Sequence, residues 1–160
     1  MSRTRNLALC GVLAALYAAL TIATPALSYG PLQLRLAEAL CLLPVLLPQT
    51  VWGLALGCFA ANLFSTVTAL DAVIGTLATL LAGLWIRRCR RLWLTPLPLA
   101  LCNGALVGAM LAWFYTPGQF FSGFALFIAQ VAAGELIVGY GLGLPLLLLL
   151  KKSRLPERYQ

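Results

Sequence analysis

Acidic residues and histidine are scarce in this sequence of 160 residues. Only four Asp and Glu residues occur, histidine is absent, and charged residues make up 9% of the chain. The absence of histidine excludes Ser–His and Cys–His nucleophilic pairs and the HExxH zinc motif. The five cysteines show no CxxC spacing, so neither a disulfide nor a metal site is predicted. The phosphate-binding P-loop motif is also missing, so we expect no ATP binding by that route.

Apolar residues are present in excess. Hydrophobic residues make up 62% of the chain, whereas about a quarter of the residues in soluble domains are charged. We therefore predict an all-α integral membrane protein. Its first apolar run, Leu7 to Leu27, is longer than the core of a signal peptide and is followed by further apolar segments. We interpret it as a retained helix.

The basic residues gather in three clusters, Arg3/Arg5, Arg87 to Arg91 and Lys151 to Arg158. Basic clusters beside apolar spans mark cytoplasmic loops, so the net charge of +7 does not indicate nucleic-acid binding. If all three clusters are cytoplasmic, an even number of spans separates each pair. The breaks between apolar runs then predict a single domain, residues 1–160, with six transmembrane helices and both termini in the cytoplasm. The predicted spans are 7–27, 32–47, 51–65, 71–86, 96–115 and 120–150.

The last predicted span is longer than one straight crossing of a bilayer requires. Its glycine-rich stretch, GELIVGYGLGLP, is expected to contain a bend, or the ends of the helix are expected to project from the membrane.

Four charged residues, Arg35, Glu38, Asp71 and Glu135, lie in or at the ends of the predicted spans. Charges there are rare and indicate a functional site that faces the protein interior. The predicted topology places most of this group in the outer half of the membrane and Glu135 near its middle. The other proposed binding residues are Gln33, Asn62, Tyr29 and Trp52, and further polar candidates are Thr76, Thr79, Asn103, Gln119 and Gln130.

Structural roles for the same charges stay open at this point. Arg35 and Glu38 are three residues apart and could pair on a helix. Arg35 could instead extend to the outer headgroups. Asp71 could cap a helix.

Three carboxylates and one arginine favour a neutral or cationic solute with several hydrogen-bond donors. The edge of a guanine ring presents an N–H and an NH₂ side by side, which a carboxylate can accept together. A second acid could pair with an ammonium group. Thiamine or a polyamine fits the same charges.

Small residues recur in the first span, at Gly11, Ala15 and Ala19 and again at Ala14 and Ala18. Small residues four apart form a ridge against which another helix can pack closely. That helix could belong to this chain or to a partner subunit.

One small unit without a P-loop and without internal repeats suggests the solute-capturing half of a transport machine whose motor is a separate subunit. Two other classes of protein also fit the sequence. One is a small intramembrane enzyme with Glu135 and Asp71 as general acid and base. The other is a proton-coupled exporter that depends on a single glutamate.

Four stretches carry a family resemblance: YGPLQLRLAEALCLLPVLLP, WGLALGCFAANLFS, LDAVIGTLATLLA and GELIVGYGLGLP. Together they resemble the queuosine-precursor transporter family (QueT), the substrate-binding S-components of energy-coupling factor (ECF) transporters. The resemblance runs from about Leu7 to Leu148.

The resemblance implies a six-helix, multi-pass protein of a bacterial cell membrane that binds a 7-deazaguanine from outside. The solute would be the aminomethyl precursor of queuosine (preQ1) or queuine, and an S-component for another vitamin is the alternative. The resemblance also implies association with a transmembrane coupling subunit and two ABC-type ATPases, which would use the ATP, with no cofactor in this chain. The small residues of the first helix would then face the coupling subunit.

Overall fold

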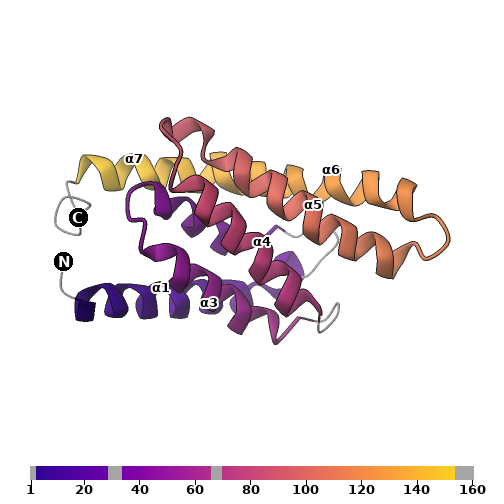
Figure 1. Ribbon diagram of the computed structural model, residues 1–160, viewed down its shortest axis with the longest axis horizontal. Helices are drawn as coiled ribbons and strands as arrows, with labels where there is room; N and C mark the ends of the chain where they lie inside the picture. The colour runs from indigo at the N-terminus through magenta and orange to yellow at the C-terminus, as the bar shows by residue number, and fades with distance from the viewer. Residues whose placement is uncertain (1–2, 29–33, 66–69, 154–160) are drawn as a thin grey trace.

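The computed structural model describes residues 3–28, 34–65 and 70–153, and in these ranges the chain forms helices and turns without a strand. Figure 1 shows them as a bundle whose helices run roughly along its long axis. The helices, in chain order, are α1 (Arg3–Ala23), α2 (Pro25–Ser28), η1 (Leu36–Val45), α3 (Thr50–Asn62), α4 (Leu70–Ile86), η2 (Leu92–Leu94), α5 (Pro96–Tyr115), α6 (Phe120–Val138), η3 (Gly139–Gly143) and α7 (Leu144–Lys152). The prediction of an all-helical protein is therefore confirmed for the described residues.

Three helical stretches are long and apolar enough to cross a membrane, Arg3–Ala23, Leu92–Tyr115 and Phe120–Lys152. Three shorter apolar helices, η1, α3 and α4, correspond to the other predicted spans. The helix bounds agree with the predicted breaks to within a few residues, except in the second span. The count of six crossings stays a prediction.

The second predicted span, 32–47, contains a ten-residue 3₁₀-helix in place of a long α-helix. Pro44 lies inside η1 and has no N–H to donate, and a 3₁₀-helix of this length covers only about 20 Å. Residues 37–44 are all buried. A helix that is apolar on every side is stable only when it is surrounded by protein, and η1 contacts α1, α3, α4, α6 and α7.

The chain runs back and forth along the bundle (Figure 1). The start of α1, the link between α4 and η2 and the end of α7 all lie toward one end, and the turn between α5 and α6 lies at the other. The described parts of the three basic clusters belong to these first three places. The arrangement therefore brings the clusters to one end, as the parity of the predicted spans requires.

Helices α1 and α3 pack closely because α3 offers glycines to α1. A Cβ atom at Gly57 would lie 2.7 Å from the Ala14 carbonyl oxygen, and one at Gly53 would lie 2.5 Å from that of Cys10. Only residues without a side chain allow this approach. The contact fixes the face of α1 that carries Tyr17 against the centre of the bundle, where Tyr17 is fully buried.

The outside of the bundle is apolar. Large hydrophobic side chains are exposed on each of the long helices, including Leu7, Trp113 and Phe121. Exposed apolar surface of this extent is typical of contact with lipid or with another protein.

Candidate functional site

Five of the predicted binding residues lie buried inside the bundle. Their exposed fractions are 3% for Arg35, 1% for Glu38, 1% for Asn62, 0% for Asp71 and 3% for Glu135. They come from the start of η1, the end of α3, the first turn of α4 and the interior of α6. Charged groups are almost never buried without partners, so the contacts of each one decide what it does.

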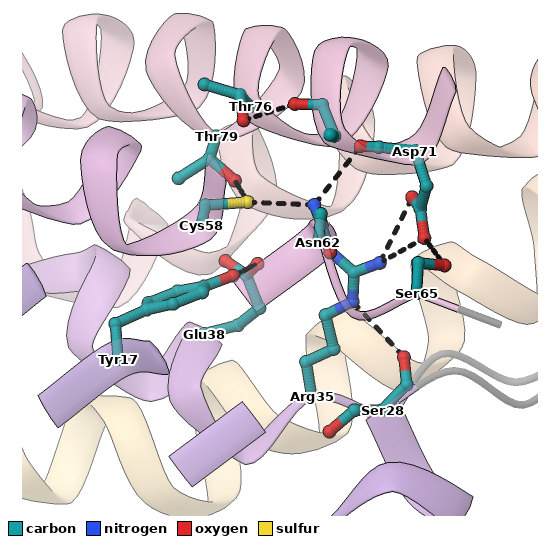
Figure 2. Close-up of polar contacts among 11 residues, drawn as sticks. Tyr17, Ser28, Arg35, Glu38, Cys58, Asn62, Ser65, Asp71, Thr76 and Thr79 are labelled. Carbon is teal, nitrogen blue, oxygen red and sulfur yellow. Dashed lines mark hydrogen bonds and ion pairs between the residues drawn. The ribbon is translucent and has the colours of Figure 1, made fainter. Parts of the chain in front are cut away.

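Arg35 and Asp71 form an ion pair that joins η1 to α4 (Figure 2). One guanidinium nitrogen of Arg35, Nη2, donates to both carboxylate oxygens of Asp71, each at 3.2 Å. Arg35 Nε donates to the Ser28 carbonyl oxygen at 3.2 Å, and the Ser65 hydroxyl donates to Asp71 Oδ2 at 2.7 Å. The partner of Arg35 is therefore Asp71, and the possible pairing with Glu38 is not the one that forms.

Asn62 holds the end of α3 against α4. Its side-chain nitrogen donates to the Asp71 backbone carbonyl oxygen at 3.1 Å and contacts the Cys58 sulfur at 3.3 Å. The Thr79 hydroxyl donates to the same sulfur at 3.3 Å. A Cβ atom at Gly75 would lie 2.5 Å from the Asn62 side-chain nitrogen. Glycine at this position therefore makes room for the amide.

Glu38 is bound by a residue that the sequence analysis missed. The Tyr17 hydroxyl donates to Glu38 Oε1 at 2.5 Å, as Figure 2 shows. Tyr17 is the one tyrosine of the first apolar run. That isolated hydroxyl was the available signal, because a buried tyrosine O–H usually finds a partner.

Four buried polar atoms in this region have no hydrogen-bond partner among the described residues. They are Glu38 Oε2, Glu135 Oε2, Asn62 Oδ1 and Asn103 Nδ2. An unpartnered buried group costs about 1–3 kcal/mol, and more when it is charged. Native structures contain few such atoms, and each calls for an explanation. A bound polar molecule that completes these hydrogen bonds would supply one.

The other predicted residues lie elsewhere. Trp52 is 63% exposed at the start of α3 and is not brought to the buried cluster. Tyr29 and Gln33 lie outside the described residues. Gln119 is exposed and Gln130 is half-buried. The Thr76 hydroxyl bonds to the carbonyl oxygen of Ala72 in its own helix.

The small residues of α1 lie on two faces. Gly11, Ala15 and Ala19 are exposed, whereas Ala14 and Ala18 are half-buried. Ala14 contacts α3 at Gly57, and Ala18 packs against the hydrophobic core. The exposed row is therefore the part of this surface that is open to a partner.

The region combines an apolar helical bundle with a buried, mostly acidic cluster that has unpartnered hydrogen-bonding atoms. In the described part of the chain, no three His, Cys, Asp or Glu residues are grouped so that they could hold a metal ion. Bundles of this kind are typical of membrane transport proteins, in which buried charges mark the path or the binding site of a solute.

The sequence profile of the QueT transporter family matches residues 7–152. The chain therefore belongs to the family of QueT transporters. The resemblance inferred from four short stretches is confirmed over nearly the whole chain.

One curated relative carries a functional name. The queuosine precursor transporter QueT of Lactococcus lactis subsp. cremoris (strain MG1363) is 35% identical over 82 residues, which cover 49% of this chain and 47% of the relative. The match thus spans about half the length of that relative. No solved structure matches the chain.

Proposed function

We propose that this chain is the substrate-capturing S-component of an ECF-type importer and that it binds a 7-deazaguanine precursor of queuosine from outside the cell. The family match over residues 7–152 is the observation that carries this proposal. The name of the Lactococcus relative supplies the class of solute. The unpartnered polar atoms of the buried cluster support binding of the solute there.

The charges of the cluster suit this solute. Asp71 is paired with Arg35, whereas Glu38 and Glu135 have no basic partner among the hydrogen bonds and ion pairs of the described residues. Two unneutralised carboxylates in an apolar interior favour a ligand with a positive charge and several N–H donors. An aminomethyl-deazaguanine has both, and queuine also carries an amine.

The orientation in the membrane follows from the basic clusters. These clusters lie at the start of α1, at the end of α7 and in the link from α4 to η2, toward one end of the bundle. The positive-inside rule assigns that end to the cytoplasm in a six-span, multi-pass arrangement. Arg35, Asn62 and Asp71 lie where η1 begins, α3 ends and α4 begins, away from the basic end. This location suits loading from outside.

Transport itself requires partners in this proposal. The coupling subunit would dock on the exposed row Gly11, Ala15 and Ala19 of α1, and two ABC-type ATPases would supply the energy. Small exposed residues allow close approach of a second helix.

Binding and uptake can be tested separately. The purified chain in detergent should bind aminomethyl-7-deazaguanine at one molecule per chain without converting it, as measured by isothermal titration calorimetry. Cells that contain the chain should accumulate the solute only when the coupling subunit and the ATPases are also present. Stoichiometric binding of thiamine in place of the deazaguanine, or uptake without the ATPases, would refute the proposal.

A further inference from the structure

The unpartnered atoms of the cluster indicate which hydrogen-bonding groups a bound ligand should present. Glu38 Oε2, Glu135 Oε2 and Asn62 Oδ1 are acceptors, and Asn103 Nδ2 is a donor. The complementary ligand presents three donors and one acceptor. A guanine-type ring with an appended ammonium group has this set in its N1–H, its 2-amino group, its ammonium group and its C6 carbonyl oxygen.

Asn103 on α5 and Glu135 on α6 lie beside one another. Their side chains are within reach of interacting, yet Asn103 Nδ2 and Glu135 Oε2 are not engaged in a well-formed hydrogen bond. Both residues are buried, with exposed fractions of 2% and 3%. A donor and an acceptor therefore lie side by side with no partner of their own among the described residues.

Helices α5 and α6 can hold this pair in a fixed relation because they pack closely on each other. Gly104, next to Asn103 in the sequence, has Ala132 of α6 only 3.3 Å from the position of its missing Cβ. A larger residue at Gly104 would push α6 away. The close contact positions the amide of Asn103 against the turn of α6 that carries Glu135.

We infer that Asn103 and Glu135 together bind the lactam edge of the ring, which is formed by its N1–H and its C6 carbonyl oxygen. The two residues thereby determine which ring the site accepts. Glu135 accepts the ring N1–H, and the Asn103 amide donates to the adjacent carbonyl oxygen. Glu38, whose other oxygen is already bound by Tyr17, takes the ammonium or the 2-amino group. The inference rests on the proposed function and adds Asn103 as a residue that distinguishes one purine-like ring from another.

An adenine-type edge reverses this pattern, because its N1 accepts and its 6-amino group donates. A carboxylate at position 135 would then face a lone pair. A site built to bond one pattern rejects a ligand that leaves its buried groups unpaired.

The test compares two ligands on the same full-length protein in detergent. One ligand is aminomethyl-7-deazaguanine, and the other is its 6-amino analogue, in which an amino group replaces the carbonyl oxygen. The native chain should bind the first at least about 100-fold more tightly, as measured by titration calorimetry. Glu135→Gln, whose amide can accept or donate, should reduce this ratio to about tenfold or less. Asn103→Leu should weaken binding of the first ligand by about 5–150-fold.

Thr21→Val is the matched control. Thr21 is fully buried, and among the described residues its hydroxyl donates to the Tyr17 carbonyl oxygen of its own helix, so its removal should leave the ratio unchanged. If Glu135→Gln does not fold, Asn103→Asp provides the same test, since it presents acceptors to the carbonyl oxygen of the ring.

The outcomes separate the two proposals. If the native chain binds neither ligand, the proposed function fails and this inference fails with it. If the native chain binds the deazaguanine but Glu135→Gln weakens both ligands equally, the proposed function stands and the assignment of the lactam edge is overturned.

Discussion

The hydroxyl of Tyr17 donates a 2.5 Å hydrogen bond to Glu38, and this contact joins α1 to the 3₁₀-helix at the centre of the bundle. Tyr17→Phe would leave both carboxylate oxygens of Glu38 without a partner among the described residues. We expect a loss of about 1–3 kcal/mol in the free energy of unfolding, because a charged group would then be buried with fewer hydrogen bonds. Thermal or denaturant unfolding in detergent measures this loss.

Tyr140→Phe is the control for that substitution. Tyr140 is 39% exposed, and its hydroxyl donates to the Trp93 carbonyl oxygen at 3.0 Å. Loss of this exposed bond should change stability by less than about 0.5 kcal/mol. Equal effects of the two substitutions would show that the Tyr17 hydroxyl has no special role.

The Arg35–Asp71 pair should stabilise the fold. In Asp71→Asn the guanidinium of Arg35 stays buried without its counter-charge, which costs about 3–5 kcal/mol when one partner of a buried pair is removed. The double variant Arg35→Gln/Asp71→Asn removes both charges and should recover part of the loss. The free energies of unfolding of the native chain, of Asp71→Asn and Arg35→Gln alone, and of the double variant give the coupling energy, and strict additivity would contradict this prediction.

Gly75→Ala should disturb the ligand site without adding a polar group. The new methyl would lie 2.5 Å from the Asn62 side-chain nitrogen and would displace the amide from Asp71. We expect at least about fivefold weaker binding of aminomethyl-7-deazaguanine.

Gly141→Ala serves as the comparison for Gly75→Ala. The position is exposed, and nothing lies within 4 Å of its missing Cβ. Binding should be unchanged, and stability should rise slightly because alanine favours the helix. A binding loss in Gly141→Ala as large as in Gly75→Ala would argue against a local effect at Asn62.

Larger side chains in the two small-residue rows of α1 should have different effects on uptake and on solute binding. Ala15→Leu enlarges an exposed position, so uptake should fall at least about tenfold while solute binding by the purified chain is retained. Ala14→Leu enlarges a position that touches Gly57, so the protein should be destabilised and binding should fall with it. Uptake assays in cells paired with calorimetry distinguish the two, and normal uptake with Ala15→Leu would refute docking on this row.

The sequence predicted the helical class and the burial of the charges because both follow from composition. Charges within apolar spans are expected to face the protein interior, and Arg35, Glu38, Asp71 and Glu135 are all buried. The ion-pair partner of each charged residue was harder to predict from the sequence. Arg35 is near Glu38 in sequence, yet it pairs with Asp71, 36 residues away.

Two features depended on three-dimensional packing and could not be predicted. The second span forms a 3₁₀-helix that is enclosed by other helices, and neither its short length nor its surroundings are determined by local propensity. Trp52 was expected to be a binding residue, but in α3 its side chain is 63% exposed. An aromatic residue near a span end carries no sign of the face on which it lies.

The π-helical turn Gly139–Gly143 sets the rotational phase of the long C-terminal helix. An α-helix turns by about 100° per residue, so Leu147 would lie about 120° around the axis from Glu135 if the helix were regular. Both side chains are nevertheless buried in the bundle. A π turn accommodates one extra residue, which reduces the difference to about 20°. A regular α-helix of the same length would instead turn α7, with Lys151 and Lys152, by about 100° around its axis relative to Glu135. The continuous helix formed by α6, η3 and α7 thus directs Glu135 into the buried cluster and Leu147 into the hydrophobic core from the same side.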